Sequence, residues 1–561
     1  MKTLDWLVLI GTTAFIVLYG IWKSRKQKGV DGFLLSGNSL PWFTISLSII
    51  ATQASAVTFL SVPGQAYTDG MRFVLFYLGL PLAMIVVSAT MVPIYYKLHV
   101  YTAYEYLETR FNVQVRTVVA FLFLIQRSLS AGISIAAPVI ILSAMFGWDV
   151  FWGNLISGLV IVLYTVTGGS EAVSQTQKLQ MGVILIGMAL AGVWIVAGLP
   201  PDVSLYDAVR FAGINDKLNT MDFKFDLDNR YNLWSGLIGG FFLQMAYFGT
   251  DQSQVGRYLG GKSIAQSRLA LLFNGIFKIP MQFSILFIGA MLFVFYQFQQ
   301  PPILFNPSSI EKLRNSELKQ DFSSIESQYN QAFALQQAQA KTLMAAQQNG
   351  TATASQKAQY DQTVKQTQAY RQQAQDLLKK QDPTANTNDT NYIFLDYITR
   401  YLPAGMVGLL IVVIFAASMS TASSELNALS TTTLIDIYKR SFKPDASDDH
   451  YIWVSKGLTL FWGIMSIFFA QLAGRLGTLI EAVNILGSLF YGTILGIFLL
   501  AFYVRYVKTQ AAFAAVFVGQ GIIFFLFFYA NIAYLWLNFV GCAVVVLSAL
   551  TWQWGSGLFK K

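Results

Sequence analysis

Charged residues, cysteine and histidine are all scarce in this chain of 561 residues. Charged side chains make up 12% of it, whereas soluble domains carry about 25%. The single cysteine, Cys542, excludes an internal disulfide framework, and His99 and His450 are too far apart in sequence to suggest a zinc site. The sequence also has no GxxxxGK[ST] phosphate loop and no G-x-S-x-G elbow, so no catalytic motif indicates an enzyme.

Long apolar runs take up most of the chain, which is 54% hydrophobic and 15% aromatic. Stretches such as "MGVILIGMALAGVWIVAGL" (181–199) approach the roughly 20 residues that a helix needs to cross a bilayer. The sequence therefore predicts an all-α membrane protein in contact with the lipid bilayer. We expect about thirteen transmembrane helices, near residues 5–22, 41–64, 73–97, 117–146, 149–168, 177–199, 233–251, 269–297, 403–438, 450–472, 477–503, 509–530 and 533–552.

Basic residues in the short loops predict the orientation of these helices. "KSRKQK" (23–28) follows the first span, and further basic loops recur after every second span, as in "YKRSFK" and "YVRYVK". We therefore expect a multi-pass protein of the cell (inner) membrane with its N-terminus outside and its C-terminus in the cytoplasm. The first span lacks a signal-peptide cleavage site, so we interpret it as a retained helix. The formal net charge of +9 reflects this cytoplasmic bias and requires no nucleic-acid partner.

One long polar segment, residues 298–402, separates the eighth and ninth predicted spans and is expected outside. Within it, residues 322–381 are rich in Gln, Ala and Lys, and "NGTATAS" (349–355) interrupts two helical runs. This pattern predicts a helical hairpin, and a flexible polar loop is the alternative. Because the composition differs so much from the rest, we expect that a short linker could replace it without loss of transport.

The most polar of the predicted membrane helices reads FAASMSTASSELNALSTTTLIDIYKR (415–440). At helical spacing, small and hydroxyl-bearing residues form one stripe: Ala417, Ser420, Thr421, Ser424, Asn427 and Thr431. Polar groups facing lipid are unfavourable, so this stripe must face protein or a water-filled cavity. Hydroxyls and carbonyls suit a hard cation such as sodium, and close helix packing through small residues is the alternative.

The second predicted span has a matching irregularity. In "LSIIATQASAVTFLSVPGQAY" (47–67), the small, polar stretch "ATQAS" divides two apolar runs. A helix that breaks there would free backbone carbonyls at the membrane midplane, which is typical of substrate and ion sites in transporters. Close packing through small residues explains the same pattern.

These stretches resemble the sodium–solute symporter family, which includes sodium-coupled glucose, proline, iodide, monocarboxylate and multivitamin carriers. The matching motifs are "ATQASAVTFLSVPGQAY", "VYTAYEYLETRF", "YTVTGGSEAVSQTQKLQ", "DQSQVGRYL" and "SMSTASSELNALSTTTLIDIYKR". The resemblance implies a LeuT-type core of two inverted five-helix repeats. The expected segments are an N-terminal helix and linker (1–40), the first repeat and start of the second (41–297), the insertion (298–402), the rest of the second repeat (403–503) and two C-terminal helices with a tail (504–561).

The resemblance also implies a set of sodium ligands. They are the carbonyls of Ala51, Ala54 and Ala417 and the hydroxyls of Ser420 and Thr421. Some family members hold a second sodium, for which Ser423 and Ser424 are present here. Those members carry an aspartate where this chain has Gln177, which weakens the case for a second ion; Glu425 is a candidate to compensate.

The solute site follows from the same resemblance. Its expected residues are Gln53, Thr58, Tyr77, Gln244, Tyr247, Phe248, Lys278 and Asn484. Lys278 is a candidate partner for an anionic solute, and its alternative role is to reach the inner interface or pair with a carboxylate. Tyr247 and Phe248 are candidates for an aromatic lid beneath the solute.

The sequence thus predicts a symporter that imports a small polar solute with sodium. The motifs favour an organic anion over a sugar or polyol, which remains the alternative. A membrane sensor or channel on the same fold is a further hypothesis, although no signalling domain is visible. The sequence does not indicate an oligomeric state.

Overall fold

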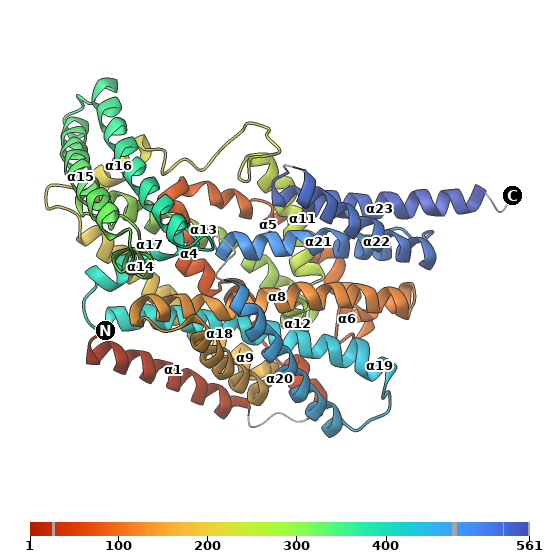
Figure 1. Cartoon of the computed structure of the whole chain (residues 1–561). Helices are drawn as coiled ribbons and strands as arrows, with labels where there is room; N and C mark the ends of the chain where they lie inside the picture. The colour runs from red at the N-terminus through yellow and green to blue at the C-terminus, as the bar shows by residue number, and fades with distance from the viewer. Residues whose placement is uncertain (25–28, 474–478, 531, 559–561) are drawn as a thin grey trace.

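The computed structural model describes residues 1–24, 29–473, 479–530 and 532–558 as a bundle of helices (Figure 1). Over these residues the only β-type pairing is an isolated bridge between Leu40 and Gly261. The helices in chain order are α1 (Thr3–Ser24), α2 (Gly29–Leu35), α3 (Trp42–Gln53), α4 (Ala56–Asp69), α5 (Leu80–Val86), α6 (Val92–Leu98), α7 (Glu105–Arg110), α8 (Val113–Phe146), α9 (Val150–Ala197), α10 (Leu205–Ile214), α11 (Gly240–Gly249), α12 (Gln252–Leu259), α13 (Ile264–Phe298), α14 (Pro307–Arg314), α15 (Lys319–Gln348), α16 (Ala354–Gln381), α17 (Thr390–Tyr401), α18 (Met406–Thr432), α19 (Lys439–Ser441), α20 (Asp448–Ala473), α21 (Leu479–Tyr503), α22 (Thr509–Tyr529) and α23 (Tyr534–Leu558).

Within the described ranges, 10 helical runs are long and apolar enough to cross a membrane. They account for ten of the thirteen predicted spans. The other three predicted spans lie near 41–64, 149–168 and 233–251. They are helical, but each is interrupted or too short to cross the membrane as one continuous helix. Long apolar helices need a bilayer to cover their outer faces, and the chain is therefore a multi-pass membrane protein.

The predicted break in "ATQAS" is confirmed. Helix α3 ends at Gln53, Ala54 leaves the helical region with φ −89° and ψ 70°, and α4 starts after the extended residue Ser55. A helix end leaves the carbonyls of its last turn without partners further along the helix. The two half-helices therefore present free backbone oxygens inside the bundle.

A second interruption divides α9. Gly169 adopts φ 58° and ψ −172°, a backbone conformation that residues with a Cβ rarely adopt. A Cβ here would also lie 2.9 Å from the ring of Phe33. The kink separates the two predicted spans at 149–168 and 177–199.

Helix α18 lies in the interior of the bundle, where it packs against α8 and α9 (Figure 1). Every residue from 416 to 432 is buried. The hydroxyl stripe is therefore enclosed within the bundle and kept from lipid, as the cost of exposing polar groups to lipid requires.

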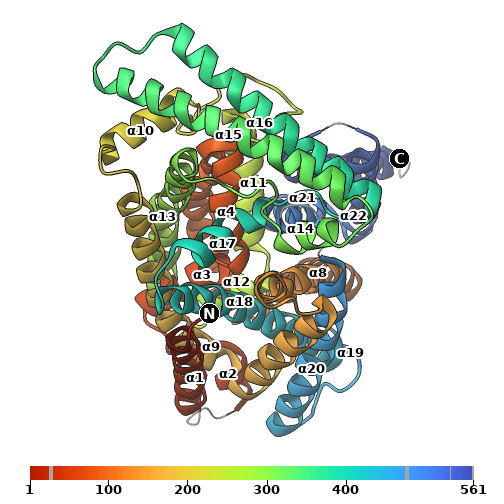
Figure 2. The same ribbon diagram turned by 60° about the vertical axis from the view of Figure 1, so that its left-hand side comes forward.

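The polar insertion folds as two long helices, α15 and α16, that lie side by side across one end of the molecule (Figures 1 and 2). Gln336 and Gln337 donate hydrogen bonds to the Gln297 side chain and the Phe298 carbonyl at the end of α13, at 2.7 and 2.6 Å. The Tyr360 ring packs on Phe211 of α10 at 5.6 Å. The hairpin is thus docked on the bundle, so its removal should cost stability, while the prediction that transport survives its removal stands.

We now expect replacement of residues 322–381 by a short Gly/Ser linker to lower the thermal unfolding temperature by several degrees. The replacement exposes Phe298 and Phe211, each worth about 1.5–3 kcal/mol when fully buried. The measurement is thermal unfolding in detergent followed by size-exclusion chromatography. Gln372→Ala, on the exposed face of α16, is the control and should leave the unfolding temperature unchanged. Equal unfolding temperatures for the linker variant and the parent would show that the docking contributes nothing.

Candidate functional site

The hydroxyls of α18 meet the end of α3 at the helix break. Ser420 Oγ donates to the Ala51 carbonyl oxygen at 3.2 Å, and Thr421 Oγ1 donates to the Thr52 carbonyl at 3.1 Å. Ala54 lies at the break itself, and Ala417 lies one turn before Thr421 on the same buried helix. The five residues of the predicted sodium site therefore lie on the two facing segments.

The donor set fits a sodium ion. The oxygens are neutral carbonyls and hydroxyls, which suit a hard cation of single charge, and the break leaves the α3 carbonyls without helical partners. Direct hydroxyl-to-carbonyl hydrogen bonds join the two helices in this structure. An ion between them would replace these bonds with contacts to both oxygens, so its binding can change how α3 and α18 meet.

Gln177 fills the space beside these ligands. Its Nε2 atom donates to Ser420 Oγ at 2.9 Å, Ser424 Oγ at 2.9 Å and Thr52 Oγ1 at 3.1 Å. Its Oε1 atom accepts from Ser48. The amide nitrogen is thus surrounded by oxygens in the way that a cation would be. Ser423, the other predicted ligand of a second sodium, instead donates to the Ser420 carbonyl at 3.1 Å.

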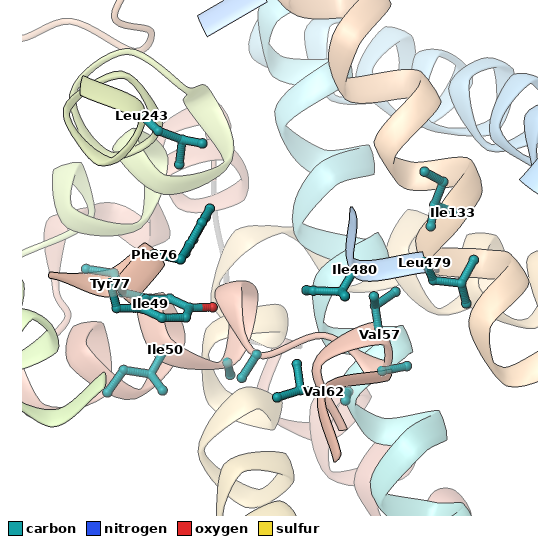
Figure 3. Packing of buried hydrophobic residues seen from close by; sticks show 14 of the residues in the cluster. Ile49, Ile50, Val57, Val62, Phe76, Tyr77, Ile133, Leu243, Leu479 and Ile480 are labelled. Carbon is teal, nitrogen blue, oxygen red and sulfur yellow. The ribbon is translucent and has the colours of Figure 1, made fainter. Parts of the chain in front are cut away.

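A cavity of ≈ 80 Å³ adjoins this site; we call it the central cavity. Thr52 and Thr421 line it as well as belonging to the contact between α3 and α18. Figure 3 shows part of its wall, with Phe76 and Leu243 on one side and Val57 and Ile480 on the other. Six of the predicted solute residues line it: Gln53, Thr58, Tyr77, Gln244, Tyr247 and Asn484.

Two predicted solute residues, Lys278 and Phe248, do not line the central cavity in this conformation. Lys278 is fully buried on α13, and its ammonium lies 5.4 Å from the centre of the Tyr77 ring. Nζ has no hydrogen-bond partner among the described residues. Phe248 is buried against Tyr247, with ring centres 5.0 Å apart. Lys278 therefore contacts Tyr77, which lines the central cavity, but does not itself line the cavity in this conformation.

Sequence reasoning missed a buried ionic network on the cavity wall, which we call the Arg127 network. The guanidinium of Arg127 on α8 donates to Glu425 Oε1 at 2.8 Å and to the Tyr491 hydroxyl at 2.6 Å, and it pairs with Asp251. Tyr491 donates to Asp251 at 2.8 Å, and Ser130 donates to Glu425 at 2.7 Å. Glu425 Oε1 is thus bound to Arg127 and Ser130 and not to Ser423 or Ser424. An arginine inside an apolar span, "FLFLIQRSLSAGIS", was the available signal.

A broken helix whose free carbonyls face a hydroxyl-lined helix beside a buried cavity is the arrangement of a secondary transporter. The sequence profile of the sodium:solute symporter family matches residues 33–316 and 377–519, and the chain belongs to that family. It is a sodium-coupled solute symporter and not an enzyme. The gap between the two matched ranges contains most of the hairpin formed by α15 and α16.

Known proteins with similar sequences carry different solutes. The chain is 25% identical over 520 residues to sodium-coupled monocarboxylate transporter 2 of Bos taurus, covering 92% of this chain and 71% of that one. It is 28% identical over 509 residues to the human sodium/iodide cotransporter, covering 89% and 66%. The solved structure of a Na⁺-coupled sialic acid symporter, 22% identical, superimposes with a TM-score of 0.75 over 98% of both chains. The LeuT-type fold is therefore confirmed, and the solute is left open.

Proposed function

We propose that the chain imports a small organic monocarboxylate together with one sodium ion. The observation that carries this proposal is Arg127, the only cationic side chain among the described residues that line the central cavity. Its Nε atom has no hydrogen-bond partner among the described residues and can donate to a solute oxygen. The cavity of ≈ 80 Å³ is well below the 300–1,000 Å³ typical of drug-sized ligands, which favours a solute of few atoms. The monocarboxylate carriers among the relatives support the same class.

Electrostatics provides a coupling mechanism for such a solute. One guanidinium faces two carboxylates in the Arg127 network, so the region has an excess negative charge. An anion entering the cavity alone would be repelled. Sodium held by Ala51, Ala54, Ala417, Ser420 and Thr421 would neutralise this excess, and Thr421 also lines the cavity. Each ligand then raises the affinity for the other, as thermodynamic linkage requires.

Uptake into proteoliposomes under an inward sodium gradient tests the proposal. The series comprises short-chain monocarboxylates, iodide, a carboxylated vitamin and neutral sugars. Saturable sodium-dependent uptake of a monocarboxylate supports the proposal. Uptake of sugars alone contradicts it and favours the alternative, a sugar or polyol symporter, for which the amides of Gln53, Gln126, Gln244 and Asn484 would supply neutral hydrogen bonds. Lys278→Gln tests the role of Lys278 in the same assay. If Lys278 contacts the solute directly, the variant should lose most of its anion binding. If Lys278 contacts only the Tyr77 ring, the loss should be modest.

The hydroxyls around the Gln177 amide support a stoichiometry of one sodium, because Nε2 already bonds Ser424 and the Ser423 hydroxyl bonds the Ser420 carbonyl, so neither serine is free for a second ion. We expect Gln177→Asp to add a carboxylate among the hydroxyls of Thr52 and Ser424 and to create a second cation site. The sodium dependence of binding should become steeper, with a Hill coefficient rising from about 1 towards 2. Gln177→Asn, which keeps the amide, is the control. An unchanged Hill coefficient in the folded aspartate variant would argue against this account of Gln177.

We infer from the basic loops that the N-terminus and the hairpin lie outside and that the loop before α20 lies in the cytoplasm. Cys542 is buried and is the only cysteine, so Cys542→Ala gives a background for labelling. In that background, an impermeant thiol reagent applied to intact cells should label Gln372→Cys and leave Asp445→Cys unlabelled. Both positions are exposed in the structure. The opposite pattern would reverse the orientation.

A further inference from the structure

A second, wider cavity lies next to the central cavity, on the hairpin side of the molecule. It measures ≈ 460 Å³, and we call it the vestibule. Its walls are the end of α4, the helical turns Gly70–Tyr77, the loop of residues 215–231 and the start of α21. Glu481 lines the vestibule and its neighbour Ile480 lines the central cavity, so the two spaces are adjacent along α21.

Aromatic rings separate the two cavities. Phe73 lines the vestibule, whereas Phe76 and Tyr77 line the central cavity. The rings of Phe73 and Phe76 stack at 5.4 Å, and Tyr231 packs edge-on against Phe73 at 5.3 Å. The partition consists of side chains, which can move aside by changing rotamer. The vestibule therefore lies where a solute could enter the central cavity once these side chains move.

Most charged side chains of the vestibule already have a partner in the protein or in solvent. Arg230 pairs with Glu481, and Lys217 donates to the Thr68 carbonyl. Burial lowers the pKa of the Lys217 ammonium to about 8, so it still carries charge at neutral pH. Asp69 accepts from Gln65. Asp216 and Asp228 stand at the exposed rim, where water solvates them.

Arg72 is the exception. Its side chain is half-buried in the wall of the vestibule. Its Nε atom is buried and has no hydrogen-bond partner, and no ion pair to its guanidinium is present over the described residues. A planar guanidinium with free donors is suited to a carboxylate, which it can bind through two parallel hydrogen bonds. The buried Nε–H lacks the hydrogen bond that it would have in water, so a ligand that supplies an acceptor is favoured.

We propose that the vestibule is an outer binding site for the transported carboxylate, in which Arg72 receives the anion before it passes the aromatic partition. This inference rests on the proposed function, because it requires an anionic solute. Arg72 and the sodium ligands lie on different elements: Arg72 is in the turns after α4, whereas the sodium ligands are at the break before α4 and on α18. Binding in the vestibule should therefore occur without sodium, whereas binding in the central cavity requires it.

The test is equilibrium binding of radiolabelled propionate to the purified full-length chain, with and without sodium. The binding curve of the wild type should have two components. The tighter propionate binding should need sodium, and the weaker propionate binding should not. Arg72→Gln should remove the sodium-independent component and raise the KM of uptake about tenfold, since glutamine cannot supply the charge-assisted hydrogen bonds of a guanidinium. It should leave the sodium-dependent component and the maximal rate in place. Arg72→Lys, which keeps the charge, should retain most of the sodium-independent binding.

The outcomes separate this inference from the proposed function. Sodium-dependent binding alone in wild type, or sodium-independent binding that survives in folded Arg72→Gln, overturns the outer site and leaves the proposed function intact. No propionate bound at any sodium concentration contradicts the proposed function. Ser420→Ala/Thr421→Ala supplies the converse control, since it should lose the sodium-dependent component and keep the other.

Discussion

Replacing both Ser420 and Thr421 by alanine is expected to weaken sodium binding so far that ordinary sodium concentrations no longer stimulate transport, while the protein stays folded. The substitutions delete two of the five proposed ligand oxygens and the two hydrogen bonds that join α18 to the end of α3. Each lost contact to a charged partner costs about 1.5–3 kcal/mol, so the sodium concentration for half-maximal uptake should rise at least about a hundredfold. The measurement is uptake as a function of sodium concentration.

Ser430→Ala is the matched control for this pair. Ser430 is equally buried on α18, but its hydroxyl bonds Ser455 at 2.9 Å and not α3. It should leave the sodium dependence unchanged. The sodium assignment fails if the double variant is folded and keeps the sodium affinity of the parent.

Arg127→Met is expected to have the largest effect on stability of any single substitution discussed. It leaves Asp251 and Glu425 buried without their cation, and breaking a buried ion pair in this way costs about 3–5 kcal/mol. A whole domain is stable by only about 5–15 kcal/mol. We expect little monodisperse protein after extraction, as judged by size-exclusion chromatography. Arg314→Met, which breaks an exposed pair with Glu326, should behave like wild type.

A compensated variant separates folding from function. Combining Arg127→Met with Asp251→Asn and Glu425→Gln removes all three charges and should restore folding, because neutral groups of similar size cost far less to bury. Uptake should stay absent, since the cavity then has no cation for the solute. Restored uptake of a carboxylate in the triple variant would show that Arg127 has only a structural role.

The parts of this architecture that could be predicted from sequence are those set by local composition. Apolar length predicts membrane helices, and the small residues of "ATQAS" predict the break between α3 and α4. Polar residues in α18 predict a buried face because lipid excludes them. Each inference needs only one short stretch of the chain.

The Arg127 network could not be predicted in the same way. Arg127 and Glu425 are 298 residues apart in sequence, and Tyr491 is 240 residues from Asp251. Which buried charges meet depends on how four helices pack, and no periodicity within one helix encodes that. Lys278 shows the same limit: its isolation among apolar residues was visible in the sequence, but its contact with the Tyr77 ring was not.

The hairpin of α15 and α16 also has a practical consequence for imaging. A membrane protein of 62.4 kDa built only of crossing helices gives nearly featureless projections once detergent surrounds it. Two long helices lying across one end (Figure 2) break that symmetry and mark which end is which. Their docking against α10 and α13 holds them in a fixed orientation. The hairpin can therefore serve as a built-in landmark for aligning single particles, and as an epitope for antibody fragments that leave the transport core untouched.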